Sequence, residues 1–488
     1  MKLSKVFLTI GIVLFTIISC TESLELENPN ELSDDTFFKR PEQLQSAVDA
    51  IYANLQTEAL FARVWYYMYD NLAHEVETNP QQEANKRVYF DYNYNAEDAY
   101  IFQYWDNCFR GINKANFVIQ NEDNFENVSQ DVINTSVGEA KFMRAFYYSM
   151  LVTRFGGVPL YIEPTGEGQP RASEEEVYEQ IFADLNDASR KLGSKANTDG
   201  GRPSAGAALG LLGKMYLYQG RWADAKTAFE QMAGYALVSN YEDNFLEETE
   251  FNLESVWELN FTLAFGATTD WSGVGTGTGI HEYSFRGQDM GWNDWFNSYP
   301  SPDLVDEYEA NDPRLNANFY FNGDMFNNGN DVVAIPLERT VAWKKYQLYY
   351  KQPNENQASG INCRIIRYAD VLLMRAEAEN ELGNNQAAID LLNQVRDRVG
   401  MPNYGTSEMN AIYPVSSKQE IFEAIVHERR VELAGEQVRF DDLVRWDRAD
   451  AELSQFGFRE GVHERFPIPF QEINTNPSIT EAEQNPGF

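Results

Sequence analysis

The residues best suited to hold a ligand lie in an aromatic-rich stretch between residues 271 and 299. Flat side chains there alternate with Gly, Asn, Asp and Ser. A sugar ring presents an apolar C–H face, which an indole or phenol ring covers, and a rim of hydroxyls, which amides and carboxylates bind. Aromatic side chains also become ordered at a low entropic cost. The pattern predicts a carbohydrate-binding surface, and the selected rings are Trp271, Tyr283, Trp292 and Trp295.

A second aromatic tract covers residues 87–95, where Asn and aromatic residues alternate. From this tract we select Tyr92 and Asn93 as further ligand-binding residues. Both tracts also have a purely structural interpretation. The rings of the first would pack its loops onto the fold, and the second would be an ordinary edge strand.

Motifs for catalysis and metal binding are mostly absent. Each of the 4 His is followed by Glu, yet none begins the His-Glu-x-x-His helix of a zinc protease. No Gly-x-Ser-x-Gly nucleophile turn occurs, and the glycine-rich run 275–279 lacks the Gly-Lys-Ser/Thr ending of a phosphate loop. We therefore predict no catalytic residues, no metal ligands and no cofactor. A carboxylate pair for glycoside hydrolysis and a structural Ca²⁺ ion stay open.

The charge balance restricts the partners. Asp and Glu total 75 against 39 Lys and Arg, for a net charge of −36. Nucleic-acid binders neutralise phosphates with a basic surface, so this composition excludes that class. The same acidity raises the cost of approach for anionic polymers, which favours a neutral ligand.

The N-terminus has the features of a secretory signal. Lys2 and Lys5 precede an apolar run over residues 6–18, which is shorter than the about 20 residues that span a bilayer. The sequence IISC at 17–20 resembles a bacterial lipobox, so we predict lipidation of Cys20; the alternative is plain secretion. Whether Cys108 and Cys363 form a disulfide stays open.

A helix-pair repeat forms the predicted scaffold. Residues 209–232 fit one tetratricopeptide (TPR) unit, with small residues at the signature positions. Gly213 and Ala225 would let the two helices approach closely, and Tyr216 and Phe229 would fill the groove between them. A weaker copy covers residues 367–400. The fold class we predict is therefore mainly α, a scaffold of TPR-like helix pairs.

Between these helices lies a stretch of different character. Apolar period and capping signals predict further helices at 41–55, 101–119, 139–155, 174–192 and 421–433. Residues 251–351 have no such period and are rich in Gly and Asn, with short strands expected at 255–260 and 331–335. We interpret them as an irregular, loop-rich insert, and long loops kept in a compact domain commonly carry function.

Several motifs, taken as a set, resemble those of the SusD/RagB family of Bacteroidetes outer-membrane lipoproteins. They extend from the lipobox to the last residue: AKFMRAFYY at 140–148, FGGVPL at 155–160, the TPR turn at 210–222, RYADVLLMRAEA at 367–378, ERRVEL at 428–433, RFDDLVRW at 439–446, PIP at 467–469 and NPGF at 485–488.

The resemblance implies a SusD-like, TPR-based scaffold that carries an irregular ligand-binding region. It implies a surface-exposed lipoprotein, anchored in the cell outer membrane through Cys20, that binds a glycan without cleaving it. Its partner would be a SusC-like TonB-dependent transporter, to which the glycan is delivered. Binding residues of the family lie in variable loops outside these motifs, so the resemblance assigns none here.

The predicted organisation follows from these observations. It comprises a signal peptide at 1–19, a lipidated tether at 20–40, an N-terminal SusD-like TPR region at 41–250, the ligand-binding insert at 251–351 and a C-terminal SusD/RagB helical region at 352–488. Three alternatives remain: an oligopeptide-binding lipoprotein of a RagAB-like uptake system, a glycosidase, and a TPR adaptor that binds only proteins. The sugar, its linkage and its chain length are not predicted.

Overall fold

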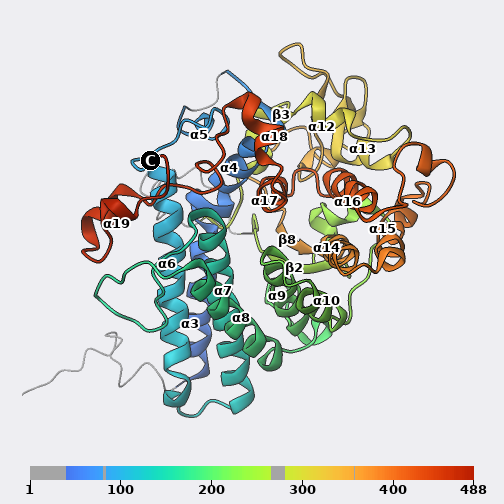
Figure 1. Cartoon of the computed structure of the whole chain (residues 1–488). Helices are drawn as coiled ribbons and strands as arrows, with labels where there is room; N and C mark the ends of the chain where they lie inside the picture. Colours follow the sequence, from blue (N-terminus) through green and yellow to red (C-terminus); the bar gives the residue numbers. More distant parts are fainter. Residues whose placement is uncertain (1–39, 81–83, 265–280, 357) are drawn as a thin grey trace, which may run out of the picture.

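Four long helices form one half of the frame. The protein is represented by a computed structural model that describes residues 40–80, 84–264, 281–356 and 358–488. Figure 1 shows the four helices side by side, with α7 packed against both α6 and α8. They are α3 (Pro41–Ala53), α6 (Ala99–Gln120), α7 (Gln130–Phe155) and α8 (Glu174–Lys191).

Capping signals set the ends of these helices. Ser173 caps α8: its hydroxyl accepts a hydrogen bond from the Glu176 N–H, and the Glu176 carboxylate returns to the Ser173 N–H. Helix α7 begins earlier than the predicted residue 139, because the Ser129 hydroxyl caps it at the Val132 N–H. The expected helices of this half are therefore present, with α7 longer than its apolar pattern predicted.

The two predicted TPR-like pairs continue the frame. They are α9 (Ala205–Tyr218) with α10 (Trp222–Glu230), and α14 (Tyr368–Glu381) with α15 (Asn385–Val399). A Cβ atom added to Gly213 would lie 2.3 Å from the Phe229 ring, so the close approach needs glycine at this position. The mainly α fold and its helix pairs are confirmed.

Shorter helices complete the upper part of the molecule in Figure 1. A main hydrophobic cluster, with members from Leu44 to Ile468, joins the two ends of the described chain. The remaining α-helices outside the insert are α4 (Val64–Leu72), α5 (Ala84–Arg87), α16 (Lys418–Glu432), α17 (Arg439–Arg445), α18 (Ala449–Leu453) and α19 (Phe470–Thr475).

The insert has more regular structure than its composition predicts. Its short helices are α11 (Arg286–Met290), α12 (Pro302–Asp306) and α13 (Pro313–Asn318). Four antiparallel strand pairs lie within the insert or tie it to its neighbours: β1 (Val76–Thr78) with β3 (Ser298–Pro300), β2 (Ser255–Leu259) with β8 (Cys363–Arg367), β4 (Phe319–Phe321) with β7 (Val341–Trp343), and β5 (Met325–Phe326) with β6 (Asp331–Val332).

The structure decides between the alternatives left open for residues 87–95 and for the two cysteines of the fold. Residues 88–95 form turns and extended coil after α5, not an edge strand. Cys108 is buried, Cys363 is half-buried, and both are free thiols. Among the residues described, none of the helices has the length and apolarity needed to cross a bilayer.

Buried ion pairs fasten the insert to the C-terminal helices. Arg314 of α13 is fully buried and its Nη1 lies 2.5 Å from Glu428 and 3.2 Å from Glu432, both on α16. Glu432 also binds Arg398 of α15 at 2.6 Å and Arg367 at 2.9 Å. Burial opposes the charged carboxylate, but these arginines hold the pKa of Glu432 well below its ordinary value.

We expect Glu432→Gln to destabilise the protein by about 3–5 kcal/mol, because it removes the one carboxylate that three buried arginine side chains share and leaves positive charge in excess there, although each arginine keeps another acidic partner. Urea unfolding followed by circular dichroism measures this loss. The matched control is Glu179→Gln, which breaks the pair between Glu179 and Arg221 at the surface and should change stability by no more than about 0.5 kcal/mol. Equal effects of the two variants would contradict the assigned role of the buried network.

The same two proteins give a pH test. A carboxylate with a depressed pKa in the folded state contributes its full stability above its unfolded pKa of about 4.3 and loses it as the pH falls. The difference in unfolding free energy between wild type and Glu432→Gln should therefore be largest at neutral pH and shrink below about pH 4. A difference that stays constant with falling pH would contradict the depressed pKa of Glu432.

Candidate functional site

A tight loop after α11 turns Trp295 outward. The Gly291 N–H donates to the Gly287 carbonyl at 2.7 Å, and the Trp295 N–H donates to the Gln288 carbonyl at 3.1 Å. A Cβ atom on Gly291 would lie 2.4 Å from the Tyr349 hydroxyl, so the loop needs glycine there. The Trp295 side chain keeps 40% of its surface exposed. It is therefore a ring that a ligand can reach.

A buried arginine braces this indole. The guanidinium carbon of Arg63, which precedes α4, lies 5.3 Å from the centre of the Trp295 ring. Asp289 of α11 fixes Arg63 through two hydrogen bonds of 2.9 and 3.0 Å. Burial favours the neutral acid, but the Arg63 charge and hydrogen bonds hold the pKa of Asp289 below its ordinary value. The ion pair thus gives the ring a rigid, charged support.

Two other selected rings of the insert lie inside it. Trp292 is 5% exposed, with Phe326 edge-on at 5.1 Å and Tyr349 at 5.5 Å between ring centres. Tyr283 is 6% exposed and packs edge-on against Phe285 at 5.3 Å. These two rings stabilise the loops around them, whereas Trp295 presents its indole at the surface.

Tyr92 and Asn93 lie apart from the aromatic cluster around Trp292. The Tyr92 ring is buried, stacks on His463 at 5.1 Å and donates its hydroxyl to the Leu72 carbonyl. Asn93 is exposed. Tyr92 thus contacts the end of α4 and the C-terminal segment, and it belongs to a different hydrophobic cluster from Trp292.

Two further selected residues, Trp271 and the lipidation site Cys20, lie outside the described residues. Within the described part of the chain, no three or more His, Cys, Asp or Glu side chains are grouped so as to hold a metal ion.

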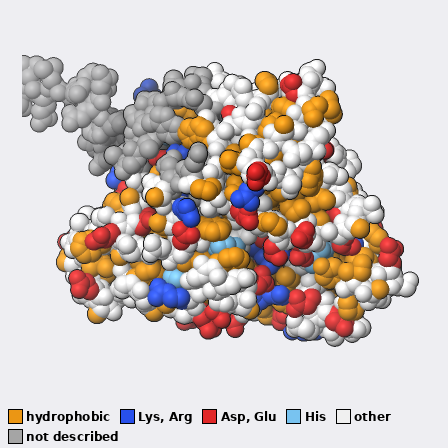
Figure 2. Space-filling view, turned by 90° about the horizontal axis from the view of Figure 1, so that it is seen from above, with side chains coloured by type: hydrophobic (Ala, Val, Ile, Leu, Met, Phe, Trp, Pro, Cys, Tyr) orange, Lys and Arg blue, Asp and Glu red, His pale blue; other side chains and the backbone are white. Residues whose placement is uncertain are grey.

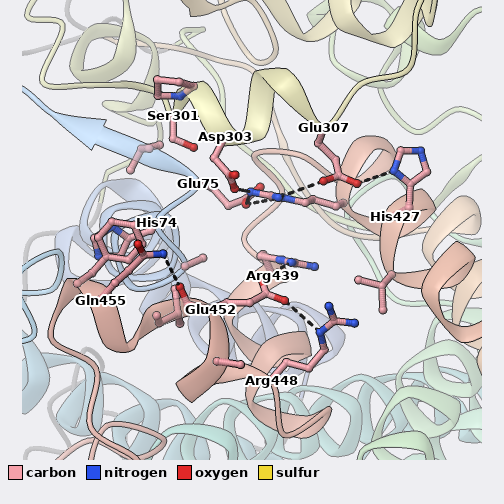
Figure 3. A pocket seen from close by; sticks show the side chains of 18 of the residues that line it. His74, Glu75, Ser301, Asp303, Glu307, His427, Arg439, Arg448, Glu452 and Gln455 are labelled. Carbon is pink, nitrogen blue, oxygen red and sulfur yellow. Dashed lines mark hydrogen bonds and ion pairs between the residues drawn. The ribbon is translucent and has the colours of Figure 1, made fainter. Parts of the chain in front are cut away.

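A hollow of about 760 Å³, which no sequence motif predicts, lies between the start of β1, α12 and the helices α16 to α18. Its lining residues come from the segments 73–77, 301–307, 413–430 and 439–456, with Phe90. Figure 3 shows charged and histidine side chains of these segments around the space. In the sequence, the hollow is marked by the His-Glu dipeptides at 74–75 and 427–428, which do not continue as a zinc motif.

Comparison with known proteins covers nearly the whole chain. A family model described as "SusD family" matches residues 253–488, and one described as "Starch-binding associating with outer membrane" matches residues 22–217. SusD-like protein P25 of Formosa agariphila is 26% identical over 99% of this chain and 99% of its own length.

Solved structures agree with this result. A structure titled "Laminarin binding SusD-like protein" is 28% identical, with a TM-score of 0.77 over 92% of this chain and 100% of the other. A SusD superfamily protein from Bacteroides vulgatus is 25% identical, with a TM-score of 0.78 over 93% of this chain and 100% of the other. The helix pairs, the motifs quoted above and both family models agree: the chain belongs to the SusD/RagB family.

Proposed function

We propose that this protein is a glycan-binding lipoprotein of the outer membrane that captures oligosaccharide without cleaving it. It then delivers the sugar to a SusC-like TonB-dependent transporter. The observation that carries the proposal is the end-to-end similarity, at 28% identity, to a protein titled as laminarin-binding. Laminarin is a neutral glucan, and a neutral ligand also suits a chain with a net charge of −36.

Trp295 is the ring that we propose contacts the sugar. Its exposed indole suits the apolar face of a pyranose, and the neighbouring Asn293 is also exposed. Below the ring, the Arg63–Asp289 pair keeps it from collapsing onto the loop. Tyr283 and Trp292 act indirectly in this proposal, because their buried rings support the loops that carry Trp295.

Binding at such a surface is modest in strength. One stacked ring and a few hydroxyl hydrogen bonds give a small surplus over the cost of ordering a flexible sugar. A lipid anchor and a transporter partner compensate for this weakness, because they hold the captured chain at the transporter mouth and raise its effective concentration there. The proposed role therefore needs the anchor as much as the binding surface.

We expect Trp295→Ala to weaken glycan binding about tenfold, as truncation of an exposed anchor ring costs about 1.4 kcal/mol. Isothermal titration calorimetry with laminarihexaose, maltohexaose and xylohexaose measures the effect on whichever sugar binds best. Trp295→Phe keeps a flat ring and should lose less affinity than Trp295→Ala.

The control variant is Phe470→Ala on α19, which removes a ring that is 42% exposed elsewhere on the surface and should leave the affinity unchanged. Equal binding by Trp295→Ala and wild type would remove Trp295 from the site. Binding of a peptide panel in place of every hexasaccharide would favour the oligopeptide alternative.

The lipid anchor is tested at Cys20. Because the lipid forms on the thiol of that residue, Cys20→Ala should abolish labelling by an alkynyl palmitate and move the protein from the membrane to the soluble fraction of a Bacteroidetes host. Cys363→Ala, which removes a half-buried free thiol, should leave both labelling and membrane association intact. Labelling that persists in Cys20→Ala would contradict the anchor.

A further inference from the structure

The hollow of about 760 Å³ is a concave site of ligand size. It lies between the end of α4 and strand β1 on one side, α12 above in Figure 3, and the helices α16 to α18. Sites for small molecules are typically clefts of about 300–1,000 Å³. Trp295 does not line this hollow, so it is distinct from the surface discussed above.

The charged groups of the wall are already paired with one another. Arg430 lies 3.0 Å from Glu75, 2.6 Å from Asp303 and 3.3 Å from Glu307. Arg448 lies 2.8 Å from Glu423. Figure 2 looks onto this side from above and shows acidic and basic side chains interspersed, with histidines between them. The lining carries more carboxylates than arginines, which disfavours an anion, and the arginines already neutralise several of these carboxylates, so we take a neutral polar ligand as the occupant.

One buried donor in the wall lacks a partner among the described residues. Arg439 is 9% exposed, and its Nη2 donates to Glu452 at 2.7 Å. Its Nη1 is buried and makes no hydrogen bond within that part of the chain. Figure 3 shows the Arg439 side chain between Glu307 and Arg448. A buried N–H without an acceptor is costly, and a hydroxyl oxygen of a ligand would satisfy it.

A flat wall completes the hollow. Phe456 is 43% exposed and stacks on the His74 ring, with 3.8 Å between centres and 13° between planes. The His74 ring also approaches Phe90 at 4.1 Å. Burial lowers the pKa of His74 to about 4, so this platform is uncharged at neutral pH. The backbone of His74 is held in the left-handed region, with φ of 53°, to place the ring there.

We propose that this hollow is a second saccharide site, which holds one or two neutral sugar rings with the apolar face of a ring on Phe456. The sugar hydroxyls accept from Arg439 and donate to carboxylate oxygens of Glu75, Glu307 and Glu452, each of which keeps lone pairs beyond its ion pair. The inference takes its ligand class from the proposed function, but its location and its residues are independent of Trp295.

The test uses the full chain after Cys20 with Trp295→Ala already present, so that the first surface is disabled. Disaccharides are the probes, namely maltose, cellobiose and laminaribiose, and saturation-transfer NMR detects binding in the millimolar range. We expect at least one disaccharide to bind this protein. Addition of Phe456→Ala should weaken that binding at least fivefold, while addition of Phe470→Ala, which removes a ring of nearly the same exposure on α19, should leave it unchanged.

A second variant tests the donor. Arg439→Lys keeps the positive charge beside Glu452 but removes a guanidinium nitrogen, so affinity for the disaccharide should fall at least threefold while the melting temperature stays near that of wild type. The inference is overturned if no disaccharide binds the Trp295→Ala protein, if Phe456→Ala and Phe470→Ala behave alike, or if the zwitterion Gly-Gly binds in place of the sugars. None of these results bears on hexasaccharide binding at Trp295. The proposed function and the second saccharide site can therefore be disproved independently of each other.

Discussion

Glu432 on α16 is the constraint on which the irregular part of this molecule depends. Three buried arginines from three segments meet its carboxylate: Arg314 of the insert, Arg367 of β8 and Arg398 of α15. An insert built from strands of two to five residues cannot hold itself together by backbone pairing. Buried ion pairs to α15 and α16, together with apolar packing against α4 and α16, hold it in place, and removing one partner of such a pair leaves an uncompensated buried charge. The helical frame thus supplies counter-ions as well as an apolar surface.

Helix α16 also connects this network to the hollow. Glu428 and Glu432 lie on its buried side, while His427 and Arg430 line the hollow. Glu307 and Glu309 of the insert bind His427 at 2.5 and 3.2 Å and, despite its burial, hold its pKa above the ordinary value. The same contact that positions the insert therefore shapes the wall of the hollow, and a ligand there would rest on the most firmly fixed part of the fold.

The sequence predicted the frame far better than the site. Helix pairs follow from local signals such as the Ser173 cap and the close approach at Gly213, which act within a few residues. The sequence does not predict that Trp292 is buried and Trp295 exposed. A loop has no helical or strand periodicity from which the buried or exposed side of each residue could be assigned. The hollow was missed for a different reason: His74, Ser301 and Phe456 are distant in sequence, and only the tertiary fold brings them to one wall.

The ladder between β1 and β3 places the two proposed sites next to each other. Ser298 to Pro300 pair with Thr78 to Val76, so one end of the ladder follows the Trp295 loop and the other leads into Ser301 and Glu75 at the hollow. Ser301 follows Trp295 by six positions, which limits the distance between their Cα atoms to about 20 Å. A glycan chain that extends over this distance can contact both sites at once. Two weak contacts joined by one chain then act as a bivalent ligand, and long glycans are held in preference to the short sugars of the medium.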